Sequence, residues 1–211
     1  HFGNRMFIAD RGFPGAVVKT GIVRKKIRIQ PKAQYAIPTS TSFEMDRTEA
    51  EPLPTLTSFG LEAEWKPIRW MGLEANVNQY QFENLPAIVA FQSSRLGNSV
   101  IGTDPSETRF RYQFAGLSQA YNLSFDYSRF LSQSFKFSII DNNEAPTDRQ
   151  RSQWVGTQLD IDFADFEISP SYALFFAESD SVPALYTAFE LGRSNREGQH
   201  IGLNLNLKRL G

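Results

Sequence analysis

Charged side chains at alternate positions are the residues of this 211-residue chain that could do chemistry. Successive side chains of a β-strand point to opposite faces, so charges two residues apart share a face. An unpaired charge is very costly to bury, and such a face needs water, counter-ions or opposite charges. We interpret these faces as the lining of a polar lumen. The candidate basic residues are Arg24, Lys26, Arg28, Lys32, Arg109 and Arg111, and the candidate acidic residues are Glu62, Glu64, Glu74, Asp160 and Asp162.

Four of these cations fall between Val23 and Ile37, where apolar side chains occupy the intervening positions except at Lys25. We expect a single strand here, with its basic face turned to the lumen and towards the acidic wall at 160–162. The alternative is an exposed basic strand at the edge of a soluble sheet, where charge prevents edge-to-edge aggregation.

Signals for catalysis and for metal binding are weak. The chain has no Cys and only two His, and it contains no phosphate-binding loop, paired-His spacing or glycine-rich dinucleotide turn. A Ser–His hydrolase would need His200 beside a Ser and a carboxylate. Asp160 and Asp162 could form a catalytic pair or bind a cation, and carboxylates on the long loops could bind calcium or divalent-bridged lipopolysaccharide. We favour solvated polar roles for all of them, and predict no enzyme activity, no cofactor and no metal site.

A hairpin between Thr57 and Phe82 is the clearest element that could position these charges. Apolar and polar residues alternate along both of its strands, and we expect Pro67 to end the first ladder because it cannot donate a hydrogen bond. Aromatic residues flank this turn and the turn at 164–165, as they do at membrane–water boundaries. The expected aromatic girdle consists of Trp65, Trp70, Phe163 and Phe166.

Similar alternation along the rest of the chain predicts nine or ten strands and no convincing helix. We expect one long strand over 109–129, whose facing changes near 116–120, and another strand over 185–191. Short turns then alternate with long loops, which is typical of outer-membrane barrels. The expected short turns lie near 66–69, 131–134 and 164–165, and the long loops at 38–54, 83–107 and 141–151.

Composition narrows the class of protein. Hydrophobic residues make up 41% of the chain, mean hydropathy is −0.36, and no run reaches the roughly 20 apolar residues of a transmembrane helix. A helical membrane protein is therefore excluded, whereas a barrel of half-apolar strands is not. The 18 Phe and 7 Tyr suit apolar bands, and a net charge of −1 argues against a nucleic-acid partner. We predict an irregular leader or plug over 1–16 and a single β-barrel domain over 17–211.

The pattern over residues 17–209 resembles the porin-type β-barrels of the Gram-negative outer membrane. The stretch His200-Ile201-Gly202-Leu203-Asn204-Leu205-Asn206-Leu207 is similar to the C-terminal insertion signal of such barrels. The resemblance implies an all-β fold, an antiparallel transmembrane β-barrel of about 8–10 strands in this chain. It also implies an outer-membrane location, contact with lipid and lipopolysaccharide, and passive diffusion of small polar solutes, with the 83–107 loop as the expected constriction.

Three functions stay open at this point. They are a diffusion channel, a non-conducting structural or adhesive barrel, and a soluble lipocalin-like barrel that binds an apolar ligand. Nine or ten strands enclose only a narrow lumen, so the chain could also be part of a larger barrel or assemble with copies of itself. The residues expected to face lipid are Phe59, Leu61, Leu73, Val77, Phe125, Phe137, Leu159, Ile161, Leu203 and Leu205.

Overall fold

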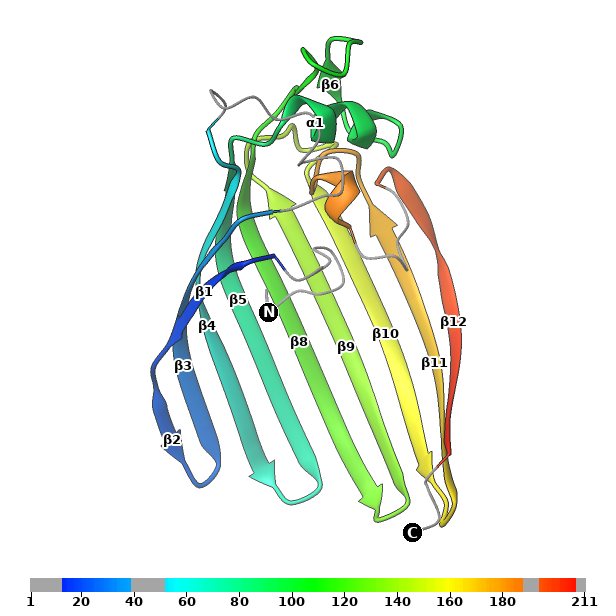
Figure 1. Cartoon of the computed structure of the whole chain (residues 1–211). Helices are drawn as coiled ribbons and strands as arrows, with labels where there is room; N and C mark the ends of the chain where they lie inside the picture. Colours follow the sequence, from blue (N-terminus) through cyan, green and yellow to red (C-terminus); the bar gives the residue numbers. More distant parts are fainter. Residues whose placement is uncertain (1–12, 39–51, 188–193, 208–211) are drawn as a thin grey trace.

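The protein is built on one large antiparallel sheet (Figure 1), seen in a computed structural model that describes residues 13–38, 52–187 and 194–207. The sheet has ten strands in the order β1-β3-β4-β5-β8-β9-β10-β11-β12, and β2 pairs with β3. The strands are β1 (Gly15–Lys19), β2 (Ile22–Arg24), β3 (Ile27–Ala36), β4 (Thr55–Ile68), β5 (Met71–Glu83), β8 (Phe114–Ser128), β9 (Leu131–Asn142), β10 (Arg151–Asp162), β11 (Phe166–Ala177) and β12 (Arg196–Leu207). The prediction of an all-β, antiparallel protein is confirmed.

The sheet is curved and open. Within the described ranges, β1 pairs only with β3 and β12 pairs only with β11, at opposite ends of the strand order. Short turns at 69–70, 129–130 and 163–165 lie at one end of the strands, and the longer connections lie at the other (Figure 1). We call the second end the loop end. It carries helix α1 (Ala87–Ser94), the 3₁₀ helix η1 (Ala184–Tyr186) and a separate two-stranded sheet of β6 (Val100–Ile101) and β7 (Arg109–Phe110).

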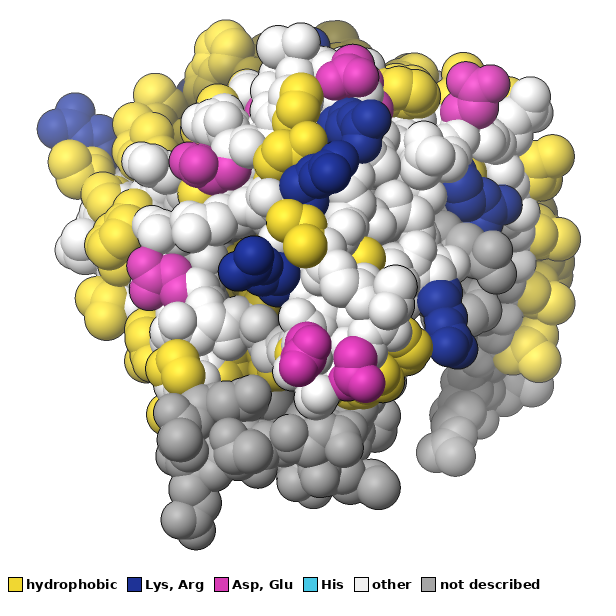
Figure 2. All heavy atoms as spheres, turned by 90° about the horizontal axis from the view of Figure 1, so that it is seen from above, with side chains coloured by type: hydrophobic (Ala, Val, Ile, Leu, Met, Phe, Trp, Pro, Cys, Tyr) yellow, Lys and Arg dark blue, Asp and Glu magenta, His cyan; other side chains and the backbone are white. Residues whose placement is uncertain are grey.

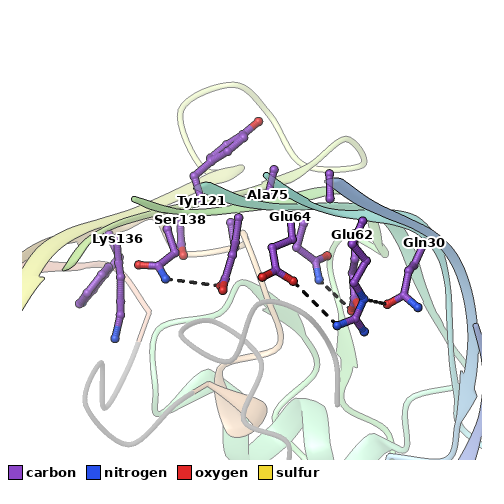
Figure 3. Close-up of a pocket in the computed structure, with 14 residues that line it drawn as sticks. Gln30, Glu62, Glu64, Ala75, Tyr121, Lys136 and Ser138 are labelled. Atoms are coloured by element: carbon purple, nitrogen blue, oxygen red, sulfur yellow. Dashed lines mark hydrogen bonds and ion pairs between the residues drawn. The ribbon is translucent and has the colours of Figure 1, made fainter. Parts of the chain in front are cut away.

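Strand pairing assigns the alternating residues to two faces. Residues directly opposite each other in antiparallel strands share a face, and Trp65, Leu73, Leu123 and Phe135 are opposite one another across β4, β5, β8 and β9. This row lies on the apolar face, together with all ten residues that were expected to face lipid. Glu62 and Glu64 lie on the other face and point to the concave side of the sheet, while Tyr121 points away from it (Figure 3). The apolar face is therefore convex and the polar face concave.

The first strands differ from expectation. The stretch 23–37 is a hairpin, with Lys25 and Lys26 forming the turn between β2 and β3. Arg24 pairs with Ile27 across that turn and so shares the convex face with it, opposite to Arg28. This two-residue turn contains no Gly, Asn or Pro, and the alternation of the sequence continues across it, so the sequence carries no mark of the turn. Strand β1 also begins at Gly15, inside the expected leader, whose residues 1–12 lie outside the described part of the chain.

The stretch 109–129 is not one strand. Pairing between β5 and β8 runs without a shift from Met71↔Phe125 to Phe82↔Phe114, so no change of facing occurs near 116–120. The chain leaves the sheet before Phe114, which is 2% exposed and packs edge-on against Phe110 at 4.9 Å between ring centroids. The expected turn at 131–134 is part of β9. Strand β4 continues past Pro67 through an irregular pairing, as a bulge permits.

The concave face is packed at the loop end. Its buried hydrophobic cluster joins side chains of the strands to Val89 of α1 and to Val182 and Tyr186 of the β11–β12 connection. The Tyr186 ring stacks on Phe82 at 6.2 Å between centroids. Leu185 and Tyr186 belong to η1 rather than to the strand expected over 185–191, and residues 188–191 of that range lie outside the described part of the chain.

Candidate functional site

A row of polar side chains crosses the middle of the concave face. Arg28, Glu64, Glu74, Asn122 and Lys136 are paired in succession across β3, β4, β5, β8 and β9. Their alternation with apolar residues places all five on one face, and strand pairing brings residues more than 100 positions apart into line. We call these five residues the charged row. It lies in a pocket of about 380 Å³ (Figure 3).

The neighbouring row completes the pocket on the side of the loop end. Gln30, Glu62, Asn76, Ser138 and Trp154 also line it. The Trp154 ring lies over Gly156, where an added Cβ would come within 2.5 Å of it. Because Gly156 is paired with Lys136, the indole forms a wall beside the lysine end of the charged row.

Ion pairs neutralise the part of the pocket on β3 and β4. Lys19 Nζ lies 2.8 Å from Glu62 Oε2, and Lys32 Nζ lies 3.3 Å from Glu62 Oε1. Glu64 is paired with Lys66 at 2.8 Å and with Arg28 at 3.9 Å. These carboxylates take their cations from β1, from the adjacent strand β3 and from their own strand β4. The expected arrangement, with a basic wall facing an acidic wall at 160–162 across a lumen, is not what these pairs form.

The other two charges of the row form no such pair with any residue that the structure describes. Glu74 is exposed and accepts a hydrogen bond from Asn122 Nδ2 at 3.4 Å. Lys136 is half-buried and has no carboxylate within ion-pair distance among the residues that the structure describes. The pocket therefore holds one carboxylate and one ammonium group that form no ion pair with the described residues, and Asn122 separates them along the row.

The remaining basic candidates lie elsewhere. Lys26 donates from the β2–β3 turn to the Pro67 carbonyl at 2.7 Å, and Arg24 lies on the convex face. Arg109 lies in β7, and Arg111 follows it, with its backbone N–H donating to Ser99 O at 2.9 Å. These two arginines are thus outside the ten-stranded sheet, because the chain leaves the sheet before Phe114.

The acidic pair at the end of β10 is on the concave face but apart from the pocket. Asp160 Oδ1 accepts a hydrogen bond from Gln158 Nε2 at 2.7 Å. Asp162 lies opposite Glu167 in the pairing of β10 with β11. Among the described residues, no group of three or more His, Cys, Asp or Glu could hold a metal ion. On the loops, hydrogen bonds from the Ser106 hydroxyl and backbone N–H lower the pKa of Asp104.

The aromatic candidates gather at the short turns. Phe163 and Phe166 stack at 4.6 Å between centroids across the β10–β11 turn, and Trp70 stacks on Phe125 at 6.2 Å. Trp65 and Trp70 are 46% and 51% exposed. Seen from the loop end, hydrophobic side chains gather along the outside of the sheet, and charged side chains lie over the loops (Figure 2).

Sequence reasoning missed a buried polar network at the loop end. Asp180 is fully buried and accepts hydrogen bonds from Ser99 N at 2.7 Å, Ser99 Oγ at 2.7 Å and Ser179 Oγ at 3.0 Å. Asn98 Nδ2 donates to Val182 O at 2.9 Å, and Asn142 Nδ2 donates to Asp180 O at 2.7 Å. These bonds fix the connection 178–187, which we call the inner segment, to the connections at 84–113 and to β9.

Burial also raises the pKa of the Tyr186 phenol, because its charged form would lose its hydration. The one sequence signal for the inner segment was the apolar run Val182-Pro183-Ala184-Leu185-Tyr186, which alternates too poorly for a strand and begins a turn at Pro183.

No helix in the described ranges has the length and apolar character needed to cross a membrane. Comparison of the chain with protein-family models, with curated protein sequences and with solved structures gave no match.

Proposed function

We propose that the chain forms all or part of a transmembrane β-barrel that carries small polar solutes passively across a bacterial outer membrane. The observation that carries this proposal is the division of the sheet into an exposed apolar convex face and a charged concave face. Phe59, Ile201 and Leu203 are 67%, 80% and 74% exposed. Soluble monomers rarely expose contiguous apolar patches beyond a few hundred Å². A soluble ligand-binding barrel would carry its apolar face inside.

Strand length and the aromatic turns support the same proposal. Strands β4, β5 and β8 to β12 have 12 to 15 residues, and a tilted strand needs about 9–11 to cross a bilayer. Exposed aromatic side chains at the short turns suit a membrane–water boundary. The convex face would then contact lipid and, in the outer leaflet, lipopolysaccharide.

A membrane also requires that the open edges be covered. Each unsatisfied backbone group in hydrocarbon costs several kcal/mol, so β12 and the β1–β2 edge need strand partners there. Further strands or a second copy of the chain would supply them. A larger ring would also widen the lumen beyond what ten strands enclose.

The packed loop end favours a second candidate, a barrel that does not conduct. The inner segment and α1 fill the concave face there with buried side chains, including Val89, Val182 and Tyr186. The 83–107 loop, expected as the constriction, contributes through α1, where Ser93 Oγ accepts from Leu185 N at 3.2 Å.

Planar-bilayer recording of the detergent-purified protein separates the candidates. A diffusion channel gives stepwise conductance in KCl, and replacing Arg28 and Lys136 with Glu shifts the reversal potential towards cations. The Arg24→Glu variant is the matched control, since Arg24 lies on the convex face. A protein that inserts into vesicles and never conducts is the structural barrel. A protein that stays monodisperse without detergent contradicts both.

A further inference from the structure

We infer that the pocket on the concave face binds a small zwitterionic solute, with its ammonium group on Glu74 and its carboxylate on Lys136. This inference deepens the proposed function and rests on it for the route by which the solute reaches the site. The binding itself depends only on the charged row and on the Trp154 wall.

The charges that stay unpaired define the class of solute. Glu62 and Glu64 are each bonded to two cations. Their charges are therefore already neutralised, and the β3–β4 side of the pocket would attract a charged ligand only weakly. Glu74 lies directly opposite Glu64, and like charges in that position repel each other. A ligand ammonium relieves that repulsion. Among the residues that the structure describes, Lys66 forms its ion pair with Glu64 and not with Glu74.

The opposite end of the row demands an anion. Lys136 has only uncharged residues beside it in the row, Asn122 on β8 and Gly156 on β10. Figure 3 shows its side chain pointing to the concave side, as Glu62 and Glu64 do. A ligand carboxylate would give this ammonium the partner that the described residues do not provide.

Spacing sets the size of the solute. Glu74 and Lys136 are separated by two strand spacings, or about 10 Å, and their side chains stand roughly perpendicular to the sheet. Two charge-assisted hydrogen bonds of about 2.8 Å each leave about 4 Å between the ligand's charged atoms. In an α-amino acid the ammonium nitrogen lies about 3 Å from a carboxylate oxygen. An α-amino acid therefore fits, and its apolar side chain would lie against Trp154, which Gly156 leaves room for.

Titration calorimetry of the detergent-solubilised full chain tests the inference with three ligands of one shape. L-leucine carries both charges, 3-methylbutylamine only the cation, and 4-methylpentanoate only the anion. We expect leucine to bind about tenfold more tightly than either analogue, since each charged hydrogen bond contributes that much or more. Equal affinities for the three ligands, or no leucine binding, overturn the inference without the need for any variant.

Two variants assign the charges. In Lys136→Gln, leucine should lose its advantage over 3-methylbutylamine, and in Glu74→Gln it should lose its advantage over 4-methylpentanoate. Arg24→Gln and Asp165→Asn, a convex-face cation and a turn carboxylate, should leave all affinities unchanged. Leucine binding that survives both pocket variants overturns the assignment.

The outcome is separable from that of the proposed function. If the protein conducts but shows no preference for leucine, the channel proposal stands and the zwitterion site is refuted. If the protein binds leucine in the expected manner but never conducts, the zwitterion site stands and the channel proposal is refuted.

Discussion

Two regions of the concave face are made by the same strands and are filled in different ways. Along β5, the inward residues Tyr80 and Phe82 are buried under the inner segment, whereas Asn76 and Glu74, further from the loop end, line an open pocket. The change from packed to open occurs near Asn78, within one strand. Alternation thus decides which face a residue occupies, and side-chain chemistry decides whether that face is packed or open.

Desolvation explains why the inner segment stops where it does. Covering Tyr80 and Phe82 removes apolar surface from water and is favourable. Covering the charged row would strip water from Glu74 and Lys136 without providing partners, which is very costly. The open part of the face is therefore the part that can bind a solute.

Phe114→Ala gives the largest expected effect. Phe114 is 2% exposed in the packed region, and its truncation should lower the free energy of unfolding by about 4 kcal/mol, from lost burial and the cavity left behind. Phe135 on the convex face is 43% exposed, and Phe135→Ala should cost clearly less. Urea titration of the detergent-folded protein measures both. Equal losses would contradict the distinction between a packed inner end and an open outer face.

Leu159→Arg extends the comparison to the two faces. Near the middle of a bilayer, an arginine facing lipid costs about 3 kcal/mol. The neighbouring Gln158→Arg places the same charge on the concave face and should change the free energy of unfolding by only a few tenths of a kcal/mol. Folding into lipid vesicles, followed by denaturant titration, measures the difference. Similar costs for the two variants would show that the convex face does not meet lipid.

Much of the sheet could be predicted because alternation is a local signal. The Thr57–Phe82 hairpin, the two faces and the aromatic residues at its turn follow from residues close together in sequence. The β2–β3 turn could not be predicted, since Lys25 and Lys26 carry no turn signal and alternation continues across them. Arg109 and Arg111 were misplaced for a related reason, because Phe110 and Phe114 alternate like one strand.

The candidate site was predictable in part. Alternation identified Arg28, Glu62, Glu64 and Glu74 as polar-face residues. It did not assign ion pairs, which depend on strand pairing. It therefore did not show that Lys136 and Trp154 line the same pocket as these carboxylates. The inner segment was missed because Asp180 and Ser99 are 81 residues apart, and their hydrogen bonds leave no periodic trace.

Asp180→Ala tests what fixes the inner segment. The substitution leaves the Ser99 N–H and hydroxyl without their buried acceptor, and we expect a loss of about 2 kcal/mol in the free energy of unfolding. The control is Asp148→Ala, because the Asp148 side chain is 75% exposed. It should change the free energy of unfolding by only a few tenths of a kcal/mol. Hydrogen exchange should also quicken over 178–187 while the strand centres stay protected. Unchanged exchange there would mean that the aromatic stack alone holds the segment.

The smallest expected effects differ in sign and compare two carboxylates of the same pocket. Glu62→Gln removes a partner of Lys19 and of Lys32, whose side chain is 1% exposed, and should cost about 1 kcal/mol. Glu74→Gln removes a charge that lies opposite Glu64 and that has only an amide donor among the described residues, so it should stabilise the protein by about 0.5 kcal/mol. The free energy of unfolding of both variants, measured at low and high salt, checks the contrast. If Glu74→Gln destabilises the protein as much as Glu62→Gln does, Glu74 already has a partner in the protein and is not held open for a ligand.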